Sequence, residues 1–185
     1  MKLHLKTAVV LGIICAVSAA LLSFVNSITS SRIDENEKLL FNQALEKVAS
    51  DAVTGEKVDV VENKYVDYFY PLYKNRILSG YVIGLKNQGY GGLITLVAAY
   101  NLSGTVESAV IVSNSETPGV GKKAENENYM NLFIGKGSVS VIPTNKNQLS
   151  DVDKTLVSGA TITFSSISKA LSEGSAFVKE LEKKL

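Results

Sequence analysis

Three loops hold the residues whose types and spacing could support chemistry. They are Gly89-Tyr90-Gly91-Gly92, the segment 115–123, and Ser158-Gly159-Ala160-Thr161-Ile162-Thr163. Glycines let a backbone turn tightly or approach a flat or anionic ligand, and Pro118 restricts the path of the second loop. The first loop by itself is more typical of a flexible turn, and the spacing of the second indicates only a loop with accessible amides.

The third loop precedes a predicted C-terminal helix and places the hydroxyls of Ser158, Thr161 and Thr163 near its start. A helix N-terminus presents free N–H groups and partial positive charge, which favour a phosphate. The alternative is a simple Ser/Thr helix cap, but a cap needs one hydroxyl and leaves Gly159 and Ala160 unexplained.

The composition removes most other chemistries. The chain has one histidine, His4, and one cysteine, Cys15, so we predict no Ser-His-Asp triad, no histidine or cysteine metal site and no intrachain disulfide. A formal net charge of +1 argues against nucleic acid as a partner. We therefore predict no catalytic side chain, and a reactive group that comes from a cofactor.

An uncharged segment follows Lys6 and ends before Arg32. Its apolar part, residues 7–28, is long enough for a helix to cross a bilayer, and it is longer than the apolar region of a cleaved signal peptide. Cys15 follows Ile14, which is too large for a lipoprotein site, so we interpret it as a membrane-helix side chain. The positive-inside rule places residues 1–6 in the cytoplasm and the body outside it.

The body is predicted to be one α+β domain in which a mostly antiparallel sheet is flanked by helices. A stalk or helical linker covers 34–60, with a helix over 34–50. Strands are predicted over 65–73, 77–86, 94–102 and 106–112, with a possible short strand at 139–142 and a helical stretch near 122–133. The C-terminal helix has an apolar stripe made of Ile167, Ala170, Leu171, Phe177, Val178, Leu181 and Leu185.

Taken together, the anchor and three motifs resemble the FMN-binding domain family of the Rnf and Nqr respiratory complexes, most closely its Rnf G-subunit branch. The motifs are Gly-Tyr-Gly-Gly at 89–92, Glu-Thr-Pro-Gly-Val-Gly at 116–121 and Ser-Gly-Ala-Thr at 158–161. The resemblance implies that residues 61–185 form an extracytoplasmic FMN-binding domain.

The resemblance also implies site residues. FMN would be attached covalently to Thr161 by a phosphoester bond that a Mg-dependent flavin transferase makes from FAD. One group of residues would line the flavin site: Glu116, Thr117, Gly119, Val120 and Gly121, with Gly91 and Gly92 close by. A second group would shape the attachment loop: Ser158, Gly159, Ala160 and Thr163.

The function so implied is that of a single-pass, electron-carrying subunit in the cytoplasmic (inner) membrane. It would belong to a ferredoxin:NAD⁺ oxidoreductase that moves Na⁺ or H⁺. Its partners would be the other membrane subunits, the transferase and membrane lipid. Two alternatives stay open: a stand-alone, membrane-anchored FMN carrier or reductase, and a structural or sensor domain without flavin.

Overall fold

The structure, a computed structural model, describes residues 2–184 and divides into two units, one up to Leu40 and one from Phe41. Helix α1 (Lys2–Ala49) begins in the first unit. Its segment Lys6–Ser30 is long and apolar enough to cross a membrane, and none of it is buried in the protein. This segment contains the predicted membrane helix at 7–28.

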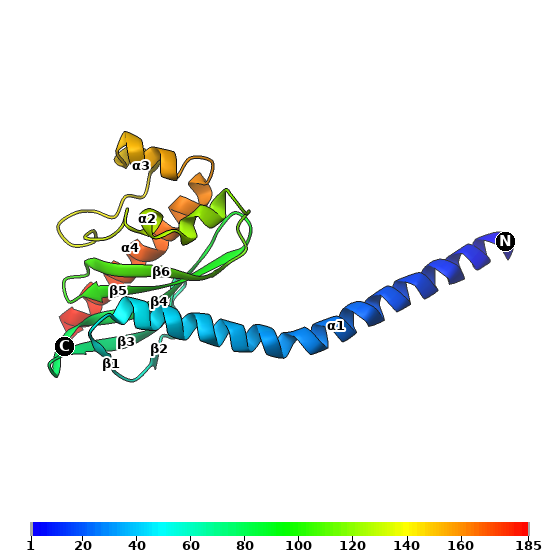
Figure 1. The fold of residues 1–185 in the computed structure, drawn as a ribbon, viewed down its shortest axis with the longest axis horizontal. Helices are drawn as coiled ribbons and strands as arrows, with labels where there is room; N and C mark the ends of the chain where they lie inside the picture. Colours follow the sequence, from blue (N-terminus) through cyan, green and yellow to red (C-terminus); the bar gives the residue numbers. More distant parts are fainter. Residues whose placement is uncertain (1, 185) are drawn as a thin grey trace. The chain divides into compact units, whose positions relative to one another are not determined.

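A six-stranded antiparallel sheet forms the centre of the second unit (Figure 1). Four long strands pair each with the next along the chain, and they confirm the four strands predicted from the sequence. They are β3 (Val66–Lys74), β4 (Ile77–Gln88), β5 (Leu93–Asn101) and β6 (Val106–Asn114). Two short strands, β1 (Val53–Thr54) and β2 (Val58–Asp59), both pair with β3 and lie within the segment assigned to the linker.

Helix α4 (Thr161–Lys184) packs along one face of this sheet. The apolar stripe predicted for it is confirmed, because Ile167, Ala170, Leu171 and Val178 are buried while Phe177 and Leu181 pack against the same core. Leu185, the last residue of the predicted stripe, lies outside the described residues. Val82, Val97 and Ala99 form a second apolar cluster with the end of α1, where Val48 and Ala49 are buried.

Short helical elements connect β6 to α4. They are η1 (Gly121–Glu125), α2 (Glu127–Met130), η2 (Lys146–Gln148) and α3 (Asp151–Leu156). The first two confirm the helical stretch predicted near 122–133. The strand predicted at 139–142 is wrong, because this segment has irregular backbone and pairs with no strand of the described chain. Val139 is 100% exposed and Val141 78% exposed, so their alternation with polar residues reflects no buried sheet face.

Candidate functional site

One pocket of about 440 Å³ brings together parts of all three loops predicted from the sequence. This volume lies within the range of about 300–1,000 Å³ that is usual for small-molecule sites. The first loop contributes Tyr90, the second contributes four residues, and the third contributes the start of α4. The lining residues are Tyr90, Glu116, Thr117, Val120, Gly121, Gly159, Ala160, Thr161, Ile162 and Thr163.

Thr161 is the first residue of α4, and its side chain is exposed at this pocket. The first main-chain hydrogen bond of the helix runs from Phe164 N to Ala160 O at 2.9 Å. The N–H groups of the first turn therefore have no partner one turn back, as at every helix N-terminus, and they carry partial positive charge. A phosphate next to the Thr161 hydroxyl would meet this end of the helix.

The loop before Thr161 is held by its buried neighbours. Val157 is fully buried, and Ala160 is 5% exposed and donates its N–H to Val157 O at 3.1 Å. Between them Gly159 has a φ of +80°, a left-handed conformation that side-chain-bearing residues rarely adopt. The tight turn keeps the start of α4 directed toward the pocket.

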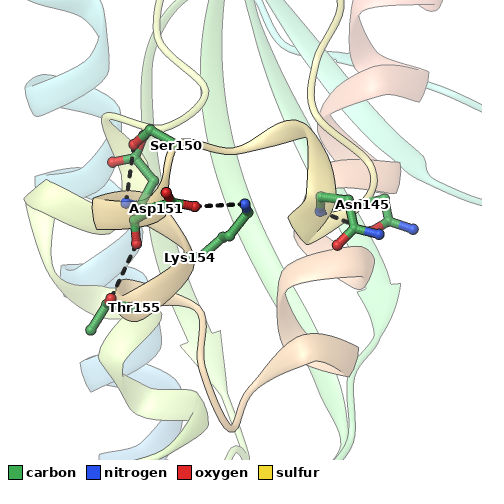
Figure 2. Close-up of polar contacts among 7 residues, drawn as sticks. Asn145, Ser150, Asp151, Lys154 and Thr155 are labelled. Atoms are coloured by element: carbon green, nitrogen blue, oxygen red, sulfur yellow. Dashed lines mark hydrogen bonds and ion pairs between the residues drawn. The ribbon is translucent and has the colours of Figure 1, made fainter.

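Helix α3 supports this loop from the N-terminal side (Figure 2). Ser150 caps α3 by accepting a hydrogen bond from Asp153 N at 3.2 Å, and Asp151 pairs with Lys154 at 2.8 Å. Thr155 Oγ1 also donates to the Asp151 carbonyl. Asp151 and Asp153, the acidic residues just upstream of Ser158, therefore form hydrogen bonds and an ion pair within α3 itself.

Glu116 lies at the centre of the site and is only 3% exposed. Its Oε1 accepts a hydrogen bond from the Gly91 N–H at 2.9 Å, and its Oε2 accepts one from the Thr163 hydroxyl at 2.5 Å. Each of the three loops thus contributes one group to a single buried hydrogen-bonded cluster. The cluster connects the first turn of α4 to the end of β4 and to the loop after β6.

Close backbone approach explains two glycines at this cluster. A Cβ on Gly89 would lie 2.3 Å from Glu116 Oε1, and a Cβ on Gly121 would lie 2.4 Å from Glu116 Oε2. Gly119 differs, because a Cβ there would meet no atom of the described residues within 4 Å, although its φ is +74°. Gly121 is needed for space and Gly119 for backbone conformation.

Tyr129, from α2, adds a buried hydroxyl near the same carboxylate. It is 2% exposed, and its hydroxyl has no hydrogen-bond partner among the side chains and backbone groups that the structure describes. Burial, together with the nearby negative charge of Glu116, raises the pKa of Tyr129 well above its ordinary value. The hydroxyl therefore remains protonated and available as a donor.

The structure gathers most of the residues predicted for the site. Glu116, Thr117, Val120, Gly121, Gly159, Ala160, Thr161 and Thr163 all line the pocket. Gly91, Gly92, Gly119 and Ser158 do not line it, and Gly91 instead binds Glu116. Sequence reasoning missed Tyr90 and Ile162, which are 72% and 54% exposed at the pocket. For Tyr90, the position of an aromatic residue between two glycines is a sequence signal that could have indicated an exposed side chain at the site.

Two known protein families match separate parts of the chain. Residues 89–175 match the FMN-binding domain family, and residues 2–48 match the RnfG N-terminal region. The first match begins at the first glycine loop and includes every residue that lines the pocket.

Curated relatives match over most of their length. The chain is 28% identical to the G subunit of the proton-translocating ferredoxin:NAD⁺ oxidoreductase complex of Clostridium ljungdahlii, over 88% of this chain and 85% of the relative. It is 27% identical to the G subunit of the ion-translocating oxidoreductase complex of Methanosarcina acetivorans, over 96% and 95%. For the G subunit of the Na⁺-translocating ferredoxin:NAD⁺ oxidoreductase complex of Acetobacterium woodii the identity is 26%, over 94% and 88%.

Among solved structures, NqrC of Shewanella oneidensis matches with a TM-score of 0.52 and 20% identity, over 73% of this chain and 70% of that chain. The likeness confirms the predicted fold class: an α+β domain with an antiparallel sheet and flanking helices, in a chain with one apolar N-terminal helix. Residues 89–175 therefore belong to the FMN-binding domain family, and over most of its length the chain is homologous to Rnf complex G subunits.

Proposed function

We propose that this protein is the electron-carrying G subunit of an Rnf-type ion-translocating ferredoxin:NAD⁺ oxidoreductase, with FMN joined to Thr161 by a phosphoester bond. One observation carries the attachment site: Thr161 is exposed at a helix N-terminus and lines a pocket of an FMN-binding domain in which all three loops meet. Homology to subunits of such complexes supports the wider role.

The residues of the pocket fit a tethered flavin mononucleotide. The start of α4 offers N–H groups to the phosphate. Tyr90, Val120 and Ile162 form an exposed apolar rim on which a flat ring can lie. Gly159 and Gly121 also line the pocket and add no side chains to it. The pocket therefore offers N–H groups for the phosphate and apolar side chains for the ring.

When bound, FMN supplies the redox chemistry that this chain's side chains lack. The protein's own residues have three tasks. Thr161 provides the hydroxyl oxygen for attachment, the first turn of α4 binds the phosphate, and the rim shields one part of the ring from water. Glu116 lies behind this surface with both carboxylate oxygens already accepting hydrogen bonds.

The membrane arrangement is part of the same proposal. Lys2 and Lys6 precede the apolar segment, while acidic residues follow Arg32, which supports a cytoplasmic N-terminus and an extracytoplasmic flavin domain. The partners are the other membrane subunits of the complex, the surrounding lipid and, during maturation, the flavin transferase. The coupling ion stays open, since the relatives include proton-translocating and Na⁺-translocating complexes.

Thr161→Ala tests the attachment site. We expect the variant to fold but to carry no covalent flavin, because loss of an exposed hydroxyl changes stability by about 0.5 kcal/mol or less. The measurement is the intact mass of the full chain after co-expression with a flavin transferase. Wild type should gain the mass of one FMN less one water.

Ser165→Ala is the matched control, since Ser165 is also exposed on α4 but lies outside the attachment loop and does not line the pocket. It should load flavin as wild type does. Covalent flavin in Thr161→Ala would contradict the proposed site.

A further inference from the structure

Glu116 places a carboxylate in the interior beside the attachment residue. Among the residues whose side chains the structure describes, no lysine or arginine forms an ion pair with it. A buried charge without a cation is expensive unless hydrogen bonds compensate for the lost water. Glu116 has two such bonds, from Gly91 and from Thr163. The carboxylate is thus held in one orientation by two hydrogen bonds, and no described cation pairs with its charge.

Two glycines pack closely against the carboxylate. The backbones of Gly89 and Gly121 lie so close that even one added carbon would collide with its oxygens, at 2.3 and 2.4 Å. The backbone N–H of Glu116 is held as well, because it donates to Asn114 Oδ1 at 3.0 Å. Glu116 is therefore held by its backbone N–H and by both carboxylate oxygens, and the start of α4 is attached to it through Thr163.

Thr163 and Thr161 share the first turn of α4, and a bond that fixes one residue fixes the orientation of the other. Thr163 is 2% exposed and directed into the protein, whereas Thr161 is exposed at the pocket. Loss of the Thr163 bond would free the first turn, which has few main-chain hydrogen bonds of its own, to fray.

We propose that the hydrogen bonds from Gly91 and Thr163 to Glu116, here named the Glu116 clamp, position the Thr161 hydroxyl for flavin attachment. This inference rests on the proposed function. In the attachment step the Thr161 oxygen bonds to the flavin-side phosphorus of FAD, the phosphoanhydride bond breaks, AMP leaves, and the hydroxyl proton passes to a base of the transferase or to water. The clamp acts before this step by holding the hydroxyl in an attackable position, so Thr163 and Glu116 are positioning residues.

The test is the rate at which purified full-length chain in detergent gains flavin from FAD, Mg²⁺ and a flavin transferase, followed by intact mass. Thr163→Val keeps the shape of the side chain but removes the donor, and we expect loading about tenfold slower than wild type. Thr163→Ser restores the hydroxyl and should load within about twofold of wild type. Folding of each variant is checked by circular dichroism.

Ser168→Ala is the matched control, because Ser168 is a fully buried serine of the same helix whose hydroxyl has no partner in the described part of the chain. It should load at the wild-type rate. Equal rates for wild type and folded Thr163→Val would overturn the clamp while leaving Thr161 as the attachment site. Absence of flavin from wild type would instead refute the proposed function itself.

Glu116→Gln is a second, independent test of the Glu116 clamp, and it can be used if Thr163→Val folds poorly. Its carbonyl oxygen can accept from Gly91, and its amide can donate to the Thr163 oxygen, so the geometry survives without the charge. We expect loading within about threefold of wild type. A folded Glu116→Gln that loads about tenfold slower would show that charge, not position, is what matters, and would overturn the positioning role.

Discussion

Thr161 and Thr163 are two residues apart in one helical turn yet lie in opposite environments. Thr161 is exposed at the pocket, while Thr163 is 2% exposed and donates to Glu116. A modifying enzyme therefore has access to one of these two hydroxyls. The chemical similarity of the two residues hides this difference in the sequence, since burial depends on what the rest of the chain packs against them.

The two glycines of the second loop should respond differently to alanine. In Gly121→Ala the new Cβ collides with Glu116 and approaches Thr163 Oγ1 to 3.0 Å, so we expect a loss of unfolding free energy of about 1–3 kcal/mol and slower flavin loading. In Gly119→Ala the only penalty is the left-handed backbone, about 1–2 kcal/mol, and loading should be unchanged.

Denaturant unfolding gives the stabilities, and intact mass gives the loading. Unchanged loading in Gly121→Ala, or slowed loading in a folded Gly119→Ala, would contradict this assignment of roles. The comparison refines the sequence-based expectation that both glycines admit the flavin ring, because Gly121 first of all makes room for Glu116.

At the scale of elements, α4 both carries the site and closes the core. Its approach to β5 is very close at Gly174, where a Cβ would lie 2.5 Å from the Tyr100 hydroxyl. That hydroxyl is fully buried and donates to Leu171 O at 2.9 Å. Burial raises the pKa of Tyr100 far above its usual range, so the bond persists at any ordinary pH.

Tyr100→Phe should lower the free energy of unfolding by about 1 kcal/mol, because it removes this buried hydrogen bond while keeping the ring. Tyr90→Phe is the control, since Tyr90 is 72% exposed and should change stability very little. Denaturant midpoints of the two variants provide the comparison. Equal midpoints would mean that the Tyr100 hydroxyl adds nothing to the packing of α4.

The elements differ in how far the sequence can predict them. The four long strands and α4 have enough residues for alternation or helical periodicity to emerge, and the sequence predicts them. Strands β1 and β2 have two residues each and exist only because they pair with β3, so no local pattern indicates them. Val139 and Val141 show the reverse case, in which strand-like alternation finds no partner strand among the described residues.

At the scale of the whole molecule, a topology experiment tests the arrangement in the membrane. A reporter that is active only outside the cytoplasm, fused after Leu185, should be active, because Lys2 and Lys6 favour a cytoplasmic N-terminus by the positive-inside rule. The same reporter fused before residue 1 should be inactive. Activity of the N-terminal fusion alone would reverse the orientation.

For the site as a whole, the sequence predicts which loops take part but not which side chains contact one another. Motif spacing indicates the three loops, since glycines and hydroxyls are visible in the sequence, and the family resemblance of those motifs implies Thr161 as the attachment residue. The role of Glu116 is not visible, because its partners are 25 and 47 residues away and the carboxylate is buried only once all three loops meet. Side chains such as Tyr90 and Ile162 join the pocket for the same reason.

The sheet also constrains the order of events in folding. Strands β3 to β6 are joined as consecutive hairpins, so they can pair rapidly as soon as they are made. Their core face, however, is covered by α4, which follows every strand along the chain. Until α4 docks, that face is open to water and to aggregation. Thr161, the proposed attachment residue, thus arrives with the element that completes the domain, so under the proposed function flavin attachment would report that folding is finished.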